Sequence, residues 1–294
     1  MILSKGQKIY QAVIHLILTL VTLSMVLPLL LFMSSITEEN SLIVNGYSLF
    51  PKKFSLYAYL YILNNSATLV RAYGISLFVT AAGTSGCLLL STLTAFPLSL
   101  KNLPGRRFFS FFVFFTMLFS GGLVPSYIMW TTWFGIRNTI WAYILPNFLL
   151  GAFNVILVRT YMSNSIPFEL YEAANIDGAS YPCIYLRIAL PLSKPILVTV
   201  GLFSGLAYWN DWTNAQYYIS DARMLSVQAL LNRMVQDIQA LLANTSANSG
   251  ALMETPQVSI RMAIAFVAII PILILYPFLQ KYFADGVMLG AIKG

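Results

Sequence analysis

The chain has 294 residues, of which 58% are hydrophobic and 9% charged, and its formal net charge is +7 at pH 7. A soluble globular domain carries about 25% charged residues, and the mean hydropathy here is +0.75. The composition therefore excludes an ordinary soluble protein and predicts an all-α membrane protein. The basic residues follow the expected topology, so they do not indicate nucleic-acid binding.

Six stretches are long and apolar enough to cross a bilayer, which requires about 20 mostly apolar residues per helix. We expect six transmembrane helices within a single domain that spans 1–294. The even number places both termini on one side. The first stretch follows two lysines, as a signal peptide would, but its apolar run is too long and lacks an A-x-A site, so we expect a retained helix. The predicted spans are about 11–35, 75–100, 108–132, 138–160, 192–213 and 259–280.

Basic residues set the orientation of these spans. The short loop KNLPGRR, residues 101–107, holds three of them and is expected on the cytoplasmic side, together with both termini. The long segments at about 36–72 and 214–258 are then extracellular. The second one contains an amphipathic helix, which is expected either to rest on the membrane surface or to dock an external partner. Its apolar residues are Leu231, Met234, Val235, Ile238, Leu241 and Leu242.

Helix-breaking residues interrupt two of the spans. Ser120-Gly121-Gly122 and Pro125 fall in the third, and Pro146-Asn147 and Gly151 fall in the fourth. Irregular backbone is tolerated at membrane depth where protein or a water-filled cavity surrounds it. The breaks therefore indicate either a substrate path or ordinary kinks at tight helix contacts.

The sequence has no visible chemistry of its own. His15 and Asp211 are the ionisable exceptions in the spans, which is too few for a proton or ion relay. There is no G-x-x-x-x-G-K-[ST] phosphate loop and no catalytic motif, so we do not expect an enzyme. Cys87 and Cys183 are too far apart in the topology to pair, and nothing indicates a metal site. Energy for active transport would have to arrive through contact with another protein.

The inner loop at about 161–191 is the surface best suited to such contact. Ser165 is expected to cap a helix that starts near Pro167. Gly178 allows a sharp reversal, because it accepts a positive φ. A second short helix over about 180–188 then leads into the fifth span. We therefore predict a cytoplasmic helix-turn-helix between helices 4 and 5, which serves either as a protein-docking knob or as a simple linker.

The run EAANIDGASYPCIYLRIALP, at 172–191, resembles the EAA loop of ABC importer permeases. It has Tyr185 where that family often has Phe. In the family this loop seats in a cleft of the ATPase subunit, so the resemblance implies that the matching residues couple transport to ATP hydrolysis. They are Glu172, Ala173, Ala174, Asp177, Gly178, Ala179, Leu190 and Pro191.

Other runs, including FSGGLVPSYIM and the ending YPFLQKYFADGVMLGAIKG, are similar to the carbohydrate-uptake branch: the maltose-type second permease and the permeases for complex oligosaccharides. The resemblance implies a sugar-import permease in a bacterial cell membrane. Its partners would be a homologous second permease, an extracellular solute-binding protein and two ATPase subunits, which carry the ATP and magnesium; this chain itself needs no cofactor. The tail, with Gly290, Lys293 and Gly294, would reach toward the ATPase dimer. An importer of another solute (a peptide or an amino acid) and a passive channel are the alternatives.

Residues able to contact a sugar gather in two places. Trp209-Asn210-Asp211-Trp212 combines flat aromatic rings with an amide and a carboxylate, which suits sugar faces and hydroxyls. Asn147 and Asn154 are seven residues apart and so share one helix face. The alternatives are an interfacial belt for the tryptophans and interhelical hydrogen bonds for the asparagines.

Overall fold

The computed structural model describes residues 5–38, 42, 53–64, 66–146, 149–244 and 258–291. Within this part of the chain the regular structure is helical, apart from an isolated β-bridge between Thr37 and Phe54. The described residues fall into two compact units. One lies within Met1–Ser66 and Arg233–Ile270, and the other within Ala67–Asn232 and Pro271–Gly294.

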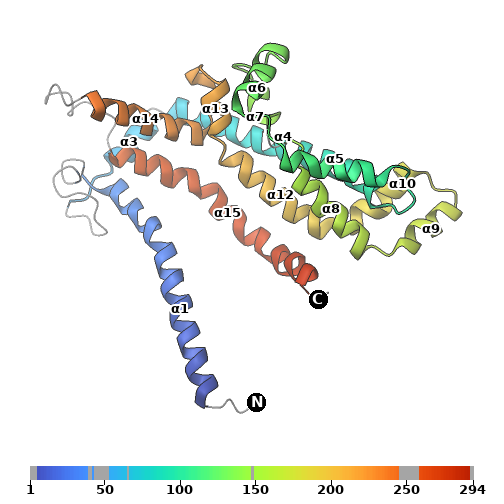
Figure 1. Ribbon diagram of the computed structural model, residues 1–294. Coiled ribbons are helices and arrows are strands. Elements are labelled where there is room, and N and C mark those ends of the chain that lie inside the picture. Colours follow the sequence, from blue (N-terminus) through green and yellow to red (C-terminus); the bar gives the residue numbers. More distant parts are fainter. Residues whose placement is uncertain are drawn as a thin grey trace. The chain divides into compact units, whose positions relative to one another are not determined.

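The first unit holds the N-terminal helix and its near neighbours. It contains α1 (Lys5–Leu30), a 3-10 turn η1 (Leu31–Ile36), α3 (Tyr57–Asn64), the later part of α14 (Val227–Asn244) and the first part of α15 (Val258–Ala291) (Figure 1). Large apolar side chains are exposed along α1 from Tyr10 to Met25. Such a surface suits lipid rather than water. The rings of Phe32 and Phe266 stack with their centroids 4.6 Å apart.

The second unit contains the remaining helices (Figure 1). The long helix α4 (Ser66–Ser99) comes first, and α12 (Lys194–Trp209) packs against it. Between them, the described residues form seven helices and two π-helical turns. These are α5 (Arg106–Leu118), α6 (Leu123–Ile128), η2 (Met129–Trp133), α7 (Trp141–Ile144), α8 (Ala152–Ser165), α9 (Phe168–Ile176), α10 (Tyr181–Ile184), η3 (Tyr185–Ala189) and α11 (Leu190–Leu192). After α12 come α13 (Thr213–Tyr218), a 3-10 turn η4 (Ala222–Met224) and the start of α14.

Small residues bring α4 and α12 together. A Cβ on Gly83 would lie 2.5 Å from the Tyr208 ring, and one on Gly201 would lie 3.3 Å from Leu88. The Tyr208 hydroxyl, which is thereby held between helices, donates to the carbonyl of Ile144 at 3.0 Å. Within a bilayer the hydrophobic effect does not drive helices together, and close approach at glycine residues is a common way for them to pack.

Few helices of the described residues are long enough to cross a bilayer unaided. By length and composition, Ala67–Ser99 is the one described helix that could cross a bilayer by itself. The number of possible crossings reaches three if each of two bent helix pairs forms one span. Those pairs are Arg106–Leu118 with Leu123–Trp133, bent by 109°, and Tyr181–Leu192 with Lys194–Trp209, bent by 79°. Tyr10–Met25 and Val258–Ile274 are shorter apolar helices.

The structure places the predicted breaks where the sequence indicated them. The third predicted span divides at Gly122, which has φ 85, and the fourth divides between α7 and α8, with Gly151 preceding α8. Neither 108–132 nor 138–160 is therefore a continuous helix. The second helix starts at Ser66 rather than near 75, and the last runs on to Ala291, through Pro271 and Pro277.

One predicted cap is wrong. Ser165 was expected to cap the helix of the inner loop, but it is the last residue of α8. Pro167 precedes α9 directly, and no side chain caps that helix. Proline tolerates this place because its φ of −57° is already helical and the first N–H groups of a helix lack partners in any case.

Candidate functional site

The reversal at Gly178 is built by backbone hydrogen bonds. The helix α9 ends at Ile176, and Gly178 follows with φ 80. The N–H of Ala179 donates to the carbonyl of Ala174 at 2.9 Å, and the N–H of Gly178 donates to Asn175 at 3.0 Å. This pair of bonds is the Schellman arrangement, in which a left-handed glycine closes a helix. The turn predicted from the sequence is confirmed, and its shape is fixed by the backbone.

An aromatic cluster anchors this loop to the end of α4. The Tyr171 side chain is buried and meets Phe96 and Phe168 edge to face, with centroids 6.0 and 6.3 Å apart. Lys101 lies 5.5 Å above the Phe168 ring. Burial raises the pKa of Tyr171 to about 12, so its phenol stays protonated at neutral pH. The hydroxyl of Tyr171 has no hydrogen-bond partner among the described residues.

Tyr185 makes the second connection between the loop and α4. Its hydroxyl lies 2.7 Å from the Thr92 hydroxyl, and its ring centroid lies 5.5 Å from that of Phe96. Both Tyr185 and Thr92 are buried. The hydroxyl that distinguishes Tyr185 from the phenylalanine common in EAA loops therefore has a specific partner, 93 residues away in the chain.

The eight predicted coupling residues divide between two faces of the loop. Ala174, Ala179 and Leu190 are half-buried and pack on the cluster that contains Tyr171 and Tyr185. The others are exposed: Glu172, Ala173, Asp177, Gly178 and Pro191. The first group supports the loop, and the second forms the surface that a partner could touch.

Sequence reasoning missed the most exposed apolar side chain of this surface. Ile176 is 87% exposed at the last position of α9, beside the exposed Asn175 and Asp177. A large aliphatic residue between polar neighbours at a helix end is the signal that could have identified it. We define Glu172, Ala173, Ile176, Asp177 and Gly178 as the knuckle surface.

The run Trp209-Asn210-Asp211-Trp212 is divided between interior and surface. Asp211 is buried, and its carboxylate accepts bonds from the backbone N–H and the side-chain amide of Asn214, at 3.0 and 2.8 Å. It thereby fixes the start of α13. Trp209 is also buried, with its ring centroid 6.3 Å from that of Tyr73. Asn210 and Trp212 are exposed.

Asn154 joins three helices. Its amide nitrogen donates to Cys87 on α4 at 3.4 Å and to Ser204 on α12 at 3.3 Å, while Cys87 and Ser204 are 3.2 Å apart. This geometry matches the interhelical alternative. Asn147 lies outside the described residues, as do Lys293 and Gly294 of the tail, whereas Gly290 lies within α15.

Comparisons with known proteins agree on one family. A family described as "Binding-protein-dependent transport system inner membrane component" matches residues 87–288. The chain is 37% identical to protein LplC of Bacillus subtilis, over 92% of this chain and 90% of the relative. It is 36% identical to the polygalacturonan/rhamnogalacturonan transport system permease protein YtcP of the same organism, over 98% and 99%.

A solved structure supports the same assignment. The chain superposes with a TM-score of 0.82 and 27% identity on a chain from the crystal structure of a bacterial ABC transporter involved in the import of the acidic polysaccharide alginate. The match covers 96% of this chain and 99% of that one. The all-helical fold of an ABC importer permease is thus present along nearly the whole chain.

Proposed function

Because the chain belongs to the family of binding-protein-dependent transport system inner membrane components, and is therefore the non-catalytic permease subunit of an ABC importer, we propose that its cargo is an oligosaccharide. The observation that carries this proposal is the match to the polygalacturonan/rhamnogalacturonan permease, which extends over 98% of this chain. The likeness to the alginate importer points to the same class of cargo.

The proposed topology has six crossings, with both termini in the cytoplasm. α1, α4, α12 and α15 supply four crossings, and the broken segments around Gly122 and Gly151 belong to the other two. The basic loop at 101–107 then faces the cytoplasm, as the positive-inside rule requires. This orientation also places the knuckle surface inside the cell.

The proposed assembly contains a second homologous permease, two ATPase subunits that bind ATP and magnesium, and an extracellular solute-binding protein. The knuckle surface seats in an ATPase subunit, with Glu172 and Asp177 as polar anchors and Ile176 as an apolar one. The tail, with Gly290, Lys293 and Gly294, reaches toward the ATPase pair. A fixed turn and a buried aromatic anchor support this role, since a rigid loop transmits displacement better than a flexible one.

In this mechanism ATP binding closes the ATPase pair and moves the knuckle surface. The Tyr185–Thr92 bond and the Tyr171–Phe96 contact pass that movement to α4. The spans then switch between inward-facing and outward-facing states, each of which is favoured by a different ligand. The chain itself contributes contact and positioning, and the partner supplies the hydrolysis.

We also propose a sugar path along Trp209-Asn210-Asp211-Trp212, Asn147 and Asn154. Trp212 and Asn210 are its exposed members, and Asn210 accepts a bond from Gln228 at 3.4 Å. The buried Asp211 holds this segment in place through Asn214. The broken backbone between α7 and α8 supports a path here, because irregular backbone commonly lines transport cavities.

Uptake by a reconstituted complex tests the cargo. Proteoliposomes that hold both permeases, the ATPase subunits and the solute-binding protein would be offered labelled oligogalacturonides, neutral galactooligosaccharides and a peptide. We expect ATP-dependent accumulation of one or both sugars and none of the peptide. Accumulation of the peptide alone would contradict the proposal, as would sugar flux that continues without ATP.

A further inference from the structure

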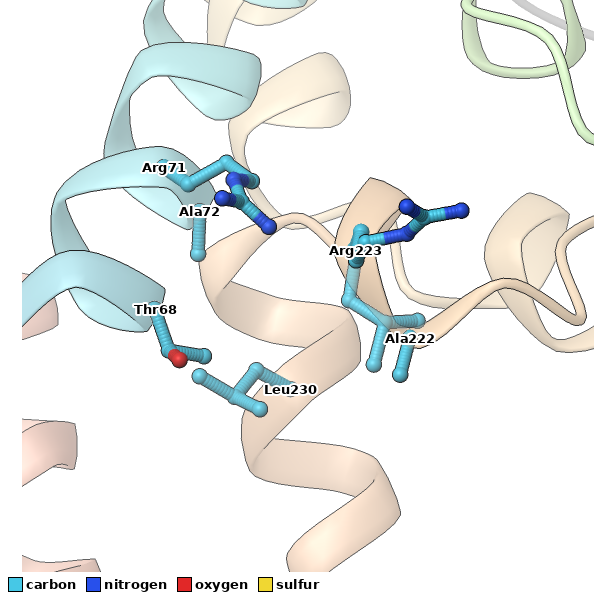
Figure 2. Close-up of a pocket in the computed structure, with 7 residues that line it drawn as sticks. Thr68, Arg71, Ala72, Ala222, Arg223 and Leu230 are labelled. Atoms are coloured by element: carbon cyan, nitrogen blue, oxygen red, sulfur yellow. The ribbon is translucent and has the colours of Figure 1, made fainter. Parts of the chain in front are cut away.

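A small pocket lies where the first turns of α4 meet the segment that leads into α14 (Figure 2). Its volume is about 130 Å³. Its aliphatic lining comes from Ala72, Ala222, Leu225 and Leu230, and its polar groups come from Thr68, Arg71 and Arg223. We call it the Arg71 pocket. The described residues that line it include no aromatic ring and no side-chain amide, so they lack the groups that suit a sugar.

The two arginines of the pocket differ in how they are engaged. The Arg223 guanidinium donates two hydrogen bonds to Asp221, at 3.0 and 3.2 Å, and in Figure 2 it points away from Arg71. Among the described residues no hydrogen bond or ion pair involves Arg71, and in Figure 2 its guanidinium reaches over the pocket. The bonds from Arg223, and to a smaller extent the charge of Arg71, lower the pKa of Asp221. The Asp221 carboxylate thus carries one negative charge near the guanidinium groups of Arg71 and Arg223. The three groups together have a net charge of +1.

The rim of the pocket is held rigidly. The side-chain oxygen of Asn138 accepts bonds from the N–H groups of Ser220 and Asp221, at 2.7 and 3.2 Å. The Tyr143 hydroxyl donates to the carbonyl of Met224 at 2.9 Å and accepts from the N–H of Ser226 at 3.0 Å. A surface that is already ordered loses little conformational entropy when a partner binds.

We propose that the Arg71 pocket receives an acidic side chain of the extracellular solute-binding protein. This inference rests on the proposed topology and assembly, which place the start of α4 on the outer side. A carboxylate on a short aliphatic stem fits the aliphatic lining beside the Arg71 guanidinium, which is not paired with any described residue. The planar fork of that guanidinium can bind both carboxylate oxygens. The excess positive charge at the rim would also speed the approach of an acidic partner surface.

Affinity measurements on the intact complex test this inference. The complex would be held in lipid nanodiscs, and its affinity measured for the solute-binding protein that stimulates its ATP hydrolysis. We expect Arg71→Ala to weaken this affinity roughly fivefold and Arg71→Glu to weaken it further, with both losses smaller at high salt. Arg137→Ala is the matched control, because it removes a positive charge from another exposed residue of the same outer side that does not line the pocket.

The outcomes separate this inference from the proposed function. Unchanged affinity in both Arg71 variants overturns the inference and leaves oligosaccharide import standing. A second outcome is that the Arg71 variants lose sugar uptake at saturating binding protein while their affinity for the binding protein is unchanged. That result would assign the pocket to the cargo and would also overturn the inference. A wild-type complex that no sugar-loaded binding protein stimulates overturns both. The strongest support would come from a charge swap. The Arg71→Glu complex would bind its solute-binding protein weakly, and replacing an acidic residue of that binding protein by lysine would restore the affinity.

Discussion

At the scale of single residues, two buried tyrosines in the same aromatic cluster have opposite hydrogen-bond status. The Tyr185 hydroxyl bonds Thr92, whereas the Tyr171 hydroxyl has no partner among the described residues. Both rings contact Phe96. The same tyrosine-to-phenylalanine substitution can therefore be made twice in one environment. At Tyr185 it removes a hydrogen bond, and at Tyr171 it removes none among the described residues.

Replacing each tyrosine by phenylalanine separates the hydroxyl from the ring. We expect Tyr185→Phe to cost about 1 kcal/mol, because a buried bond between the loop and α4 is lost. Tyr171→Phe should be neutral or slightly stabilising, because it removes a buried hydroxyl that lacks a partner. Thermal unfolding of the purified complex measures both. Equal destabilisation by the two variants would contradict the assigned role of the Thr92 bond.

The raised pKa of Tyr171 also predicts a pH effect with a definite sign. Its pKa is about 12 in the folded chain, against an ordinary value of 10.0. The folded state therefore holds the proton more tightly, and stability from this group is complete below pH 10 and declines between pH 10 and 12. The stability of Tyr171→Phe relative to the parent chain should rise over that interval. A difference that stays constant from pH 8 to 12 would show that burial does not protect this phenol.

At the scale of elements, two of the three glycines on α4 have contrasting surroundings. A Cβ on Gly83 would collide with the Tyr208 ring, whereas a Cβ on Gly74 would meet nothing within 4 Å. We expect Gly83→Ala to destabilise the complex by about 1–3 kcal/mol, because the ring and its bond to Ile144 must shift. Gly74→Ala on the same helix should be neutral or mildly stabilising. Matching unfolding temperatures for the two variants would exclude close packing of α4 on α12.

The elements also show what the sequence could predict. Gly178 was predicted as a turn because a positive φ is a local property of glycine, and the breaks at Gly122 and Gly151 were predicted for similar local reasons. The cap at Ser165 was wrong because the preceding helix α8 runs on through Ser165, and α9 begins only at Phe168. Element ends at Ser66 and Ala291 also differed, since apolar runs mark lipid contact rather than helix length.

Contacts between distant segments were beyond the reach of the sequence. The Tyr185–Thr92 bond and the Asn154–Cys87–Ser204 cluster join residues 50 to 117 positions apart, and no periodicity encodes such pairs. Asp211 illustrates the same limit. Its residue type suited a sugar site, but the structure shows its carboxylate bonded to Asn214. The motif predicted that this loop couples transport to ATP hydrolysis, which stays a prediction. The structure divides the residues of the loop into a supporting face and an exposed one.

At the scale of the whole molecule, the proposed mechanism has energy enter through contact at the knuckle surface. The chain carries no phosphate loop, and it belongs to a family whose members work with other components. The exposed side chains of Glu172, Ile176 and Asp177 are held on a fixed turn that is anchored to α4. In the proposed mechanism function depends on this surface, so changes there should uncouple transport without preventing membrane insertion.

The most direct test compares ATP-driven oligosaccharide uptake with membrane insertion in proteoliposomes. We expect Glu172→Lys to abolish uptake by reversing a surface charge, and Gly178→Pro to abolish it because proline fixes φ near −65° and removes the N–H that bonds Asn175. Asn164→Lys adds a positive charge to the same inner loop outside α9 and should leave uptake unchanged. Loss of uptake in the first two variants, with normal insertion, is the predicted result; normal uptake by complexes that carry both changes would contradict the claim.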